Sequence, residues 1–309
     1  MASAPLFILG AHRSGTTWLA NALCNHPQIF GIQAPEYGGI VESWYFSHLD
    51  GRFGRLEQRE RYLTFLDTFR RTPFFRASGV PLAQLKDLAP TGYNDFYLNF
   101  MRAGLAAQRT GARFLLEKTP VHTLYAATLA RAFPDSFFVT ITRAPADVVA
   151  SALKLRANKG QLLMPEASLR SIAALVFHRR RYQAYIDRFS SLYPNRFLNL
   201  EYESLRADPQ AEFRRCLNFI DLPWDDRVLQ STYRPNSSFQ NASTENRQAS
   251  ETLSRRQLQW VAFSATIARR VPYQIFNLWE TLRPPRNQEP IPFLLPEPAP
   301  EPFSSSPAT

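Results

Sequence analysis

The chain has 309 residues, of which 45% are hydrophobic and 20% are charged, a balance typical of a globular protein with a sizeable core. Its formal charge of +10 favours an anionic partner, such as a nucleotide, a sulfated or phosphorylated substrate, nucleic acid or a membrane surface. Cys24 and Cys216 form no CxxC pair, which argues against a disulfide framework and a zinc site. No cationic segment with a long apolar run opens the chain, so we expect a soluble, cytoplasmic protein without a transmembrane segment.

Apolar runs alternate with helical patterns along most of the chain. Residues 5–9 form a continuous apolar run, which is typical of a strand buried on both faces of a parallel sheet. Further strands are predicted at residues 29–32, 112–118, 136–142 and 195–201. Helices are predicted at residues 15–25, 120–132, 145–156, 166–189, 209–220 and 254–270. This alternation predicts an α/β fold with a parallel central sheet flanked by helices.

Two regions depart from this alternation. Residues 36–112 contain helical patterns separated by prolines, and we interpret them as a helical insertion on the substrate side of the protein. From Pro284 onward nine prolines occur in 26 residues, which predicts an extended, largely disordered tail over residues 284–309. Residues 1–283 are therefore predicted to form a single domain.

The first loop, GAHRSGTT at residues 10–17, follows a buried strand and opens a helix. It fits the first six positions of the phosphate loop, glycine, four residues and glycine, but has Thr16 where nucleotide-hydrolysing loops have lysine. A glycine bend that leads into a helix N-terminus directs backbone N–H groups and the positive end of the helix dipole at one anion. The residues predicted to bind that anion are Ser14, Gly15, Thr16 and Thr17, with Arg13 supplying the charge.

The strand at residues 136–142 indicates a second anion site. A nucleotide hydrolase needs an acidic residue at the end of such a strand to bind Mg²⁺, whereas this strand leads into Arg143. The following helix begins at Pro145 and carries Ser151 in its second turn, so Arg143 and Ser151 are expected to converge on one phosphate. Two anion sites on one sheet, without metal ligands, describe a nucleotide with groups on both its 5′ and 3′ positions.

Three segments together, RSGTTWL, EKTPVH and FFVTITRAPADVVASAL, resemble the sulfotransferases that use 3′-phosphoadenosine 5′-phosphosulfate (PAPS), and the similarity spans residues 5–220. The resemblance implies a P-loop nucleotide-fold-like architecture, closer to the arginine-loop enzymes for carbohydrates and protein tyrosines than to the cytosolic phenol and steroid enzymes. It implies that the first loop binds the 5′-phosphosulfate and that Arg143 and Ser151 bind the 3′-phosphate. It also implies a place near the adenine for Tyr202 and a weaker nucleotide contact for residues 237–239.

The reaction implied by this resemblance is metal-independent, in-line transfer of a sulfuryl group to a hydroxyl acceptor, with PAPS as co-substrate. Arg13 and Lys118 would stabilise the charge on the leaving phosphate and the transferring group. In arginine-loop members a glutamate about twenty residues downstream of the loop is the base, and Glu36 matches that placement. The histidine used by cytosolic members is a proline here, so His122 and Glu42 are the alternative candidates.

Two other functions stay open. A metal-dependent P-loop kinase or NTPase would need the loop lysine and the acidic strand end, and this sequence has neither. A non-catalytic polyanion-binding protein is suggested by the basic cluster at residues 178–181, although its spacing fits the solvated face of an amphipathic helix better than a nucleic-acid-binding surface. The acceptor also stays open among small alcohols, carbohydrates, lipid-linked glycans and peptide tyrosines, with the aromatic residues of the insertion as candidates to stack on its rings.

Overall fold

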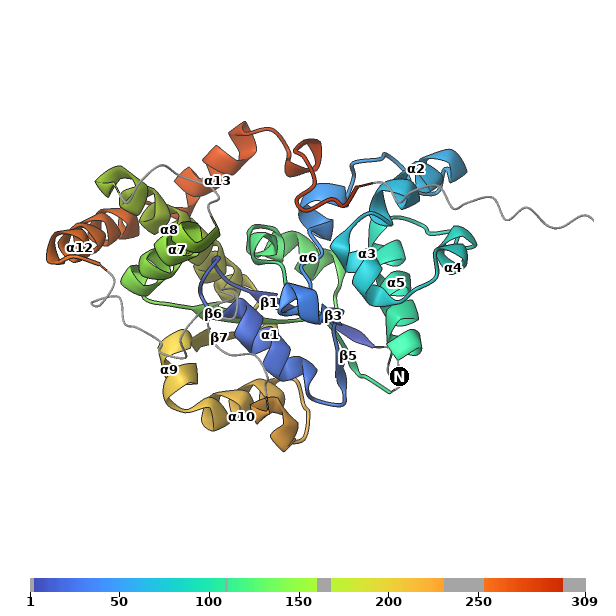
Figure 1. Ribbon diagram of the computed structural model, residues 1–309, viewed down its shortest axis with the longest axis horizontal. Helices are drawn as coiled ribbons and strands as arrows, with labels where there is room; N and C mark the ends of the chain where they lie inside the picture. Colours follow the sequence, from blue (N-terminus) through green and yellow to red (C-terminus); the bar gives the residue numbers. More distant parts are fainter. Residues whose placement is uncertain (1–2, 109–110, 160–167, 231–252, 297–309) are drawn as a thin grey trace, which may run out of the picture.

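The computed structural model describes residues 3–108, 111–159, 168–230 and 253–296 (Figure 1). Its centre is a parallel sheet with the strand order β2-β5-β1-β6-β7. The strands are β1 (Ala4–Leu9), β2 (Ile29–Phe30), β5 (Phe114–Glu117), β6 (Phe137–Thr142) and β7 (Phe197–Glu201). The central position of β1 explains its continuous apolar run, because neighbouring strands cover both its edges and helices cover both its faces. The predicted α/β class with a parallel sheet is confirmed.

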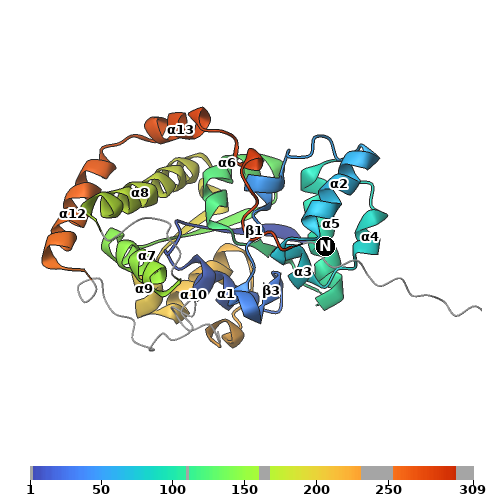
Figure 2. The ribbon, with the colours of Figure 1, turned by 45° about the horizontal axis from the view of Figure 1, so that its top comes forward.

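Helices pack on both faces of this sheet (Figures 1 and 2). The helices outside the insertion are α1 (Thr16–Cys24), α6 (Ala126–Ala132), α7 (Pro145–Lys159), α8 (Leu169–Leu192), α9 (Tyr202–Ala207), α10 (Pro209–Phe219), α12 (Arg255–Arg269) and α13 (Tyr273–Leu282). Short 3-10 turns are η3 (Pro120–Tyr125), η4 (Pro194–Arg196), η5 (Asp226–Leu229) and η6 (Arg286–Gln288). Leu6 and Ile8 of β1 pack with α1 and α10, whereas Phe7 and Leu9 pack with α6 and α8. Within the described ranges, every helix is too short or too polar to cross a membrane.

The insertion packs beside the sheet as a separate group of helices with an aromatic core. Its helices are α2 (Arg59–Phe69), α3 (Pro73–Ser78), α4 (Leu82–Lys86) and α5 (Tyr93–Gln108), and they follow β3 (Gln33–Ala34), η1 (Pro35–Tyr37), β4 (Gly39–Ile40) and the π-helical turn η2 (Tyr45–Leu49). Phe65 meets Phe96, and Phe69 meets Phe100, edge to face with ring centroids 4.8 Å apart. Most of the aromatic residues that were candidates for acceptor stacking, such as Tyr45, are instead buried in this core.

The chain after α13 returns across the molecule to the insertion (Figure 2). Asn287 donates a hydrogen bond to the carbonyl oxygen of Asp50 over 3.0 Å, and the backbone N–H of Leu295 donates to the carbonyl oxygen of Arg71 over 2.9 Å. Residues 284–296 are therefore packed against the protein, where the sequence predicted an extended appendage. Prolines are compatible with this path because isolated side-chain and backbone contacts, not a ladder of N–H donors, attach it. The rest of the Pro-rich tail lies outside the described residues.

Candidate active site

The loop between β1 and α1 makes a tight bend at the carboxyl end of β1. Gly10 has no room for a side chain, since a Cβ atom there would lie 2.6 Å from the carbonyl oxygen of Ile141. Gly15 has a φ of 98°, and a Cβ atom on it would lie 2.5 Å from the ring of Tyr202. The backbone N–H of Gly10 donates to the hydroxyl of Thr123 over 2.9 Å, and that hydroxyl donates to the Gly10 carbonyl oxygen over 3.2 Å. These contacts fix the loop between η3 on one side and α9 on the other.

Helix α1 begins without a capping side chain. Its N-cap residue is Gly15, and its first turn contains no acidic residue. The first N–H groups of a helix have no partner within the helix, and the positive end of the helix dipole lies there. This end of α1 therefore provides backbone donors and a favourable field for an anion, as predicted from the loop sequence.

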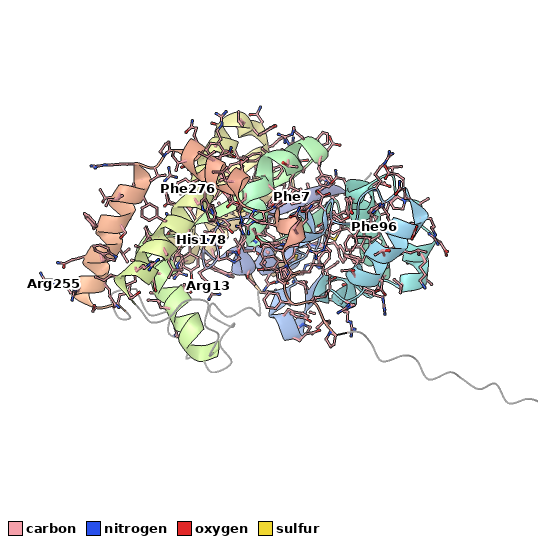
Figure 3. The ribbon with its side chains drawn as sticks, turned by 90° about the horizontal axis from the view of Figure 1, so that it is seen from above. Phe7, Arg13, Phe96, His178, Arg255 and Phe276 are labelled. Atoms are coloured by element: carbon pink, nitrogen blue, oxygen red, sulfur yellow. The ribbon has the colours of Figure 1, made fainter. Side chains whose placement is uncertain are left out.

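Three polar side chains from separate segments converge at this loop, and Figure 3 labels one of them, Arg13. Nε of Arg13 donates to Oγ of Ser151 over 3.1 Å, and Nη1 of Arg143 donates to the carbonyl oxygen of Arg13 over 3.3 Å. The Arg143 guanidinium lies 4.1 Å from the ring centroid of Tyr202, whose side chain is buried. Nε of Arg143 is buried and has no hydrogen-bond partner among the described residues. Buried donors without partners are rare, so this position fits an anion that supplies the acceptor.

The basic cluster at residues 178–181 of α8 points largely into the protein. Nε of Arg179 donates to the carbonyl oxygen of Arg143 over 2.6 Å and so supports the backbone of that residue. Arg181 is buried and forms an ion pair with Glu280 of α13, with a nitrogen–oxygen distance of 2.7 Å. These contacts give the cluster an internal structural role, which argues against the polyanion-binding alternative.

The end of β5 places a buried cation near the loop. Nζ of Lys118, which is 2% exposed, lies 2.7 Å from Oε1 of Glu42, which is 28% exposed. His12 of the loop lies within electrostatic range of both residues. The pKa of His12 is lowered, and burial is the largest cause. The Glu42 carboxylate raises this pKa, and the Lys118 ammonium lowers it. Glu36 is exposed in η1 and makes no hydrogen bond or ion pair with any described residue. The structure thus brings Glu42, and not Glu36, to Lys118.

A buried carboxylate that the sequence analysis missed, Glu117, adjoins this ion pair. Its oxygens accept hydrogen bonds from the hydroxyls of Ser43 (2.8 Å) and Thr119 (2.6 Å) and from Nδ1 of His122 (2.9 Å). Burial raises the pKa of Glu117, but the His122 imidazole and these hydrogen bonds outweigh burial and keep the pKa below its usual value. Because Ser43 and Glu117 are direct chain neighbours of the two ion-paired residues, this network fixes the backbone of both.

His122 occupies the interior of the protein. Its side chain is fully buried, its Nδ1 is bonded to Glu117, and its ring packs edge to face on Phe46 with centroids 5.4 Å apart. Its Nε2 is also buried and has no partner among the described residues. An acceptor hydroxyl has no access to this ring, so its position argues against the role of general base.

Aromatic and imidazole rings from distant segments gather around His12. The ring centroid of His12 lies 6.5 Å from that of Trp44, 5.9 Å from that of His178 and 5.9 Å from that of Tyr182. Trp44 has a φ of 52°, an uncommon backbone conformation for a bulky residue. Phe293 of the C-terminal segment comes within 6.3 Å of the Trp44 ring. Trp44 is one of the insertion aromatics that the sequence analysis considered for acceptor stacking, but neither histidine was a candidate, since nothing in the sequence links these four segments.

The histidine, cysteine and acidic side chains of the described residues are the candidates for metal ligands and nucleophiles. No group of three histidine, cysteine, aspartate or glutamate side chains in the described part of the chain is arranged to hold a metal ion. Cys24 and Cys216 are buried, unpaired thiols in the core on one face of the sheet. Burial raises the pKa of Cys216, which leaves it in the unreactive thiol form.

A parallel α/β sheet in which the loop after β1 leads into the uncapped start of α1, with Arg143 beside it, is an arrangement typical of the class of proteins that bind anions and nucleotides. Within that class the chain belongs to the sulfotransferase family, whose family model matches residues 5–226. It is 28% identical over 124 residues to an uncharacterized protein of Aquifex aeolicus (strain VF5), covering 39% of this chain and 16% of that protein. It is 40% identical over 47 residues to protein-tyrosine sulfotransferase A of Caenorhabditis elegans, covering 15% of this chain and 12% of that protein. These matches span less than a fifth of either relative.

Solved sulfotransferase structures have the same fold. A sulfotransferase from Alicyclobacillus acidocaldarius aligns with a TM-score of 0.51 at 16% identity, covering 87% of this chain and 93% of that chain. The sulfotransferase domain of the Synechococcus PCC 7002 olefin synthase aligns with a TM-score of 0.50 at 20% identity, covering 91% of this chain and 96% of that chain. The predicted sulfotransferase architecture is confirmed by these similarities.

Proposed function

We propose that this protein transfers a sulfuryl group from PAPS to a hydroxyl acceptor. Membership of the sulfotransferase family supports sulfuryl transfer in general. The observation that carries the choice of donor is the convergence of Arg13, Ser151 and Arg143 beside the uncapped N-terminus of α1. This arrangement offers two neighbouring places for anionic groups, which suits a nucleotide with a 5′-phosphosulfate and a 3′-phosphate.

The donor side of the site is the first loop together with Arg143 and Ser151. We assign the 5′-phosphosulfate to residues 13–17 and the 3′-phosphate to Arg143 and Ser151, where the unpartnered Nε of Arg143 supports an added acceptor. Tyr202 is buried beneath the Arg143 guanidinium, so we assign it the role of positioning that guanidinium near the nucleotide. The predicted contact at residues 237–239 lies outside the described residues.

The acceptor side is the Lys118–Glu42 pair together with the rings of His12, Trp44 and His178. In the proposed step, the acceptor oxygen forms a bond to sulfur and the bond between sulfur and the 5′-phosphate oxygen breaks. The hydroxyl proton passes to the Glu42 carboxylate. Arg13 and Lys118 neutralise the charge that develops on the transferring group and the leaving phosphate, and no metal ligand takes part in the step.

Glu42 replaces Glu36 as the proposed base because of the chain path between them. Strands β3 and β4 pair antiparallel, with Gln33 opposite Ile40, so the turn that contains Glu36 projects into solvent. The chain then returns toward β5, where Glu42 meets Lys118. The partly exposed carboxylate of Glu42 is accessible to an acceptor, which a general base requires.

The acceptor class in this proposal is a hydroxyl on a small molecule, a carbohydrate or a lipid-linked molecule. The ring cluster supports an acceptor with a flat or apolar face, since aromatic side chains stack on such faces. A P-loop kinase or NTPase stays the alternative, although Thr16 and Arg143 stand where that chemistry needs a lysine and an acidic residue.

Calorimetry of nucleotide binding tests the donor assignment. We expect adenosine 3′,5′-bisphosphate to bind without metal, and ATP with Mg²⁺ to bind much more weakly. Arg143→Ala is expected to weaken bisphosphate binding by about 10- to 100-fold, because a hydrogen bond to a charged group contributes roughly 1.5–3 kcal/mol. Arg188→Ala, which removes an exposed arginine of α8, is the matched control and should bind like wild type. A preference for ATP with Mg²⁺ would support the kinase alternative, and equal binding by Arg143→Ala would contradict the proposed 3′-phosphate site.

A further inference from the structure

The last two described helices carry most of the large apolar side chains that face solvent. Six of the eleven exposed large hydrophobic residues in the described ranges lie between residues 263 and 282. On α12 these are Phe263 and Ile267; on α13 they are Ile275, Leu278, Trp279 and Leu282, exposed by between 52% and 76%. Several large apolar side chains exposed on one helix of a folded protein indicate an interaction site.

The four residues on α13 form one stripe along the helix. Their spacing of three, one and three residues places them on a single face of an α-helix. The other face is fixed to the protein: Phe276 is 8% exposed, and Glu280 forms an ion pair with Arg181 of α8 (Figure 3). Arg181 also lies 4.6 Å from the ring centroid of Trp279. These contacts fix the rotation of α13 about its axis, and the apolar stripe therefore faces away from the protein. Figures 1 and 2 show α13 on the outside of α8.

The charge around this stripe has one sign. Residues 253–296 contain six arginines and two glutamates. Both glutamates are engaged in ion pairs, Glu280 with Arg181 and Arg286, and Glu289 with Arg283. Four of the arginines are exposed: Arg255, Arg256, Arg269 and Arg270. The last two lie at the junction of α12 and α13. The stripe on α13 is therefore preceded in the chain by two exposed arginines, Arg269 and Arg270.

An anionic lipid bilayer matches both properties of this surface. Helices that lie in the bilayer interface combine tryptophan and leucine on one face with arginine or lysine beside it. Each cation near an anionic membrane adds to the attraction. A second copy of the chain fits less well, because its own arginines would face these arginines across the contact. No described helix is able to cross the bilayer, so the surface would lie on it.

We propose that the stripe on α13, with the exposed arginines at the α12–α13 junction, docks the protein on anionic membranes. The proposal is independent of the sulfuryl-transfer assignment, because none of these residues belongs to the donor or acceptor side. The apolar side chains insert among the lipid chains, and the arginines contact the headgroups.

Co-sedimentation of the full chain with lipid vesicles tests the proposal. Vesicles of phosphatidylcholine with about 30% phosphatidylglycerol are expected to bind the protein, and vesicles of phosphatidylcholine alone much less, with binding reduced by salt. Leu278→Gln with Leu282→Gln is expected to weaken binding by roughly tenfold or more, given the apolar area withdrawn from the membrane. Arg269→Gln with Arg270→Gln is expected to weaken it by several-fold and to lessen the salt dependence.

The matched control is Leu63→Gln with Leu192→Gln, which changes two exposed leucines of α2 and α8 and should leave binding unchanged. Thermal unfolding of each variant separates loss of docking from loss of the fold. Equal binding to both kinds of vesicle, no binding to either, or equal weakening by the control would overturn the proposal. A wild-type dimer in sedimentation velocity that Leu278→Gln with Leu282→Gln converts to a monomer would also overturn it, since a second copy would then occupy the stripe.

Discussion

The donor side and the acceptor side of the site are assembled in different ways. The donor side uses the backbone of one loop and one helix start, and its side chains come from two strand–helix units. The acceptor side combines Glu42, Lys118 and His178 with Phe293 from the C-terminal segment. Under the proposed assignment, donor binding is therefore determined by local sequence, whereas acceptor binding depends on how distant segments pack together. The two sides should respond differently to substitution.

The largest effect is expected from Glu42→Gln on the acceptor side. The amide cannot take the hydroxyl proton, so kcat should fall by roughly 10²- to 10⁴-fold, the usual contribution of a general base. Affinity for adenosine 3′,5′-bisphosphate should stay within about threefold of wild type. Glu42 is assigned to the acceptor side, so the loss of its charge affects the bound nucleotide only through a weak, screened electrostatic interaction. The measurement is turnover of PAPS with an acceptor found in a screen of phenols, alcohols and sugars.

Glu36→Gln is the matched control for this experiment. Glu36 is exposed in η1 and makes no hydrogen bond or ion pair with a described residue, so its change should leave both kcat and nucleotide affinity unaltered. The opposite pattern, with Glu36→Gln inactive and Glu42→Gln active, would restore the base predicted from sequence spacing.

A smaller effect, confined to the donor side, is expected from Gly15→Ala. A Cβ atom here would lie 2.5 Å from the ring of Tyr202, and the φ of 98° is strained for alanine. Bisphosphate affinity should fall by about tenfold or more, because strain of roughly 1–3 kcal/mol displaces the loop. Gly111→Ala isolates the clash: its φ is 86°, but no atom lies within 4 Å of the added Cβ. Equal affinity loss in both variants would mean that the contact with Tyr202 is unimportant.

The same contrast explains what the sequence could predict. All five strands of the parallel sheet were predicted. The central strand β1 is the clearest case, because a strand buried on both faces is a continuous apolar run. The donor residues were brought together as expected because they occupy contiguous motifs next to strand ends. Helix α13 was missed, although Ile275, Leu278, Trp279 and Leu282 have the spacing of a helical stripe, which in this helix faces solvent.

The acceptor side was predicted less well for a physical reason. Counting residues from the loop selected Glu36, but the antiparallel pairing of β3 with β4 turns that residue outward. Glu117 belongs to a quoted motif, yet its burial and its bond to His122 follow only from the packing around β5. Spacing along the sequence does not show which side chains the fold turns outward or buries.

The smallest predicted effect concerns protonation of His178 on the acceptor side. Burial, the neighbouring His12 and two arginines, Arg181 and Arg286, lower the pKa of His178 from 6.5 to about 3. Its Nδ1 accepts a hydrogen bond from Nη2 of Arg181 at 3.3 Å, which requires the unprotonated nitrogen. His178 is therefore neutral in the folded protein, whereas it takes up a proton in the unfolded chain below its ordinary pKa.

Because the unfolded state binds the extra proton, the folded protein should lose stability as pH falls below 6.5 toward the folded pKa of about 3. Between pH 7.5 and 5.5 this residue accounts for up to about 1.4 kcal/mol, the value of one pKa unit. His178→Asn keeps an acceptor for Arg181 and cannot take up a proton, so urea unfolding should show a smaller loss in the variant than in wild type over this range. An equal loss in both proteins would mean that His178 keeps its ordinary pKa in the folded state, and the ring cluster of the acceptor side would then carry positive charge below about pH 6.5.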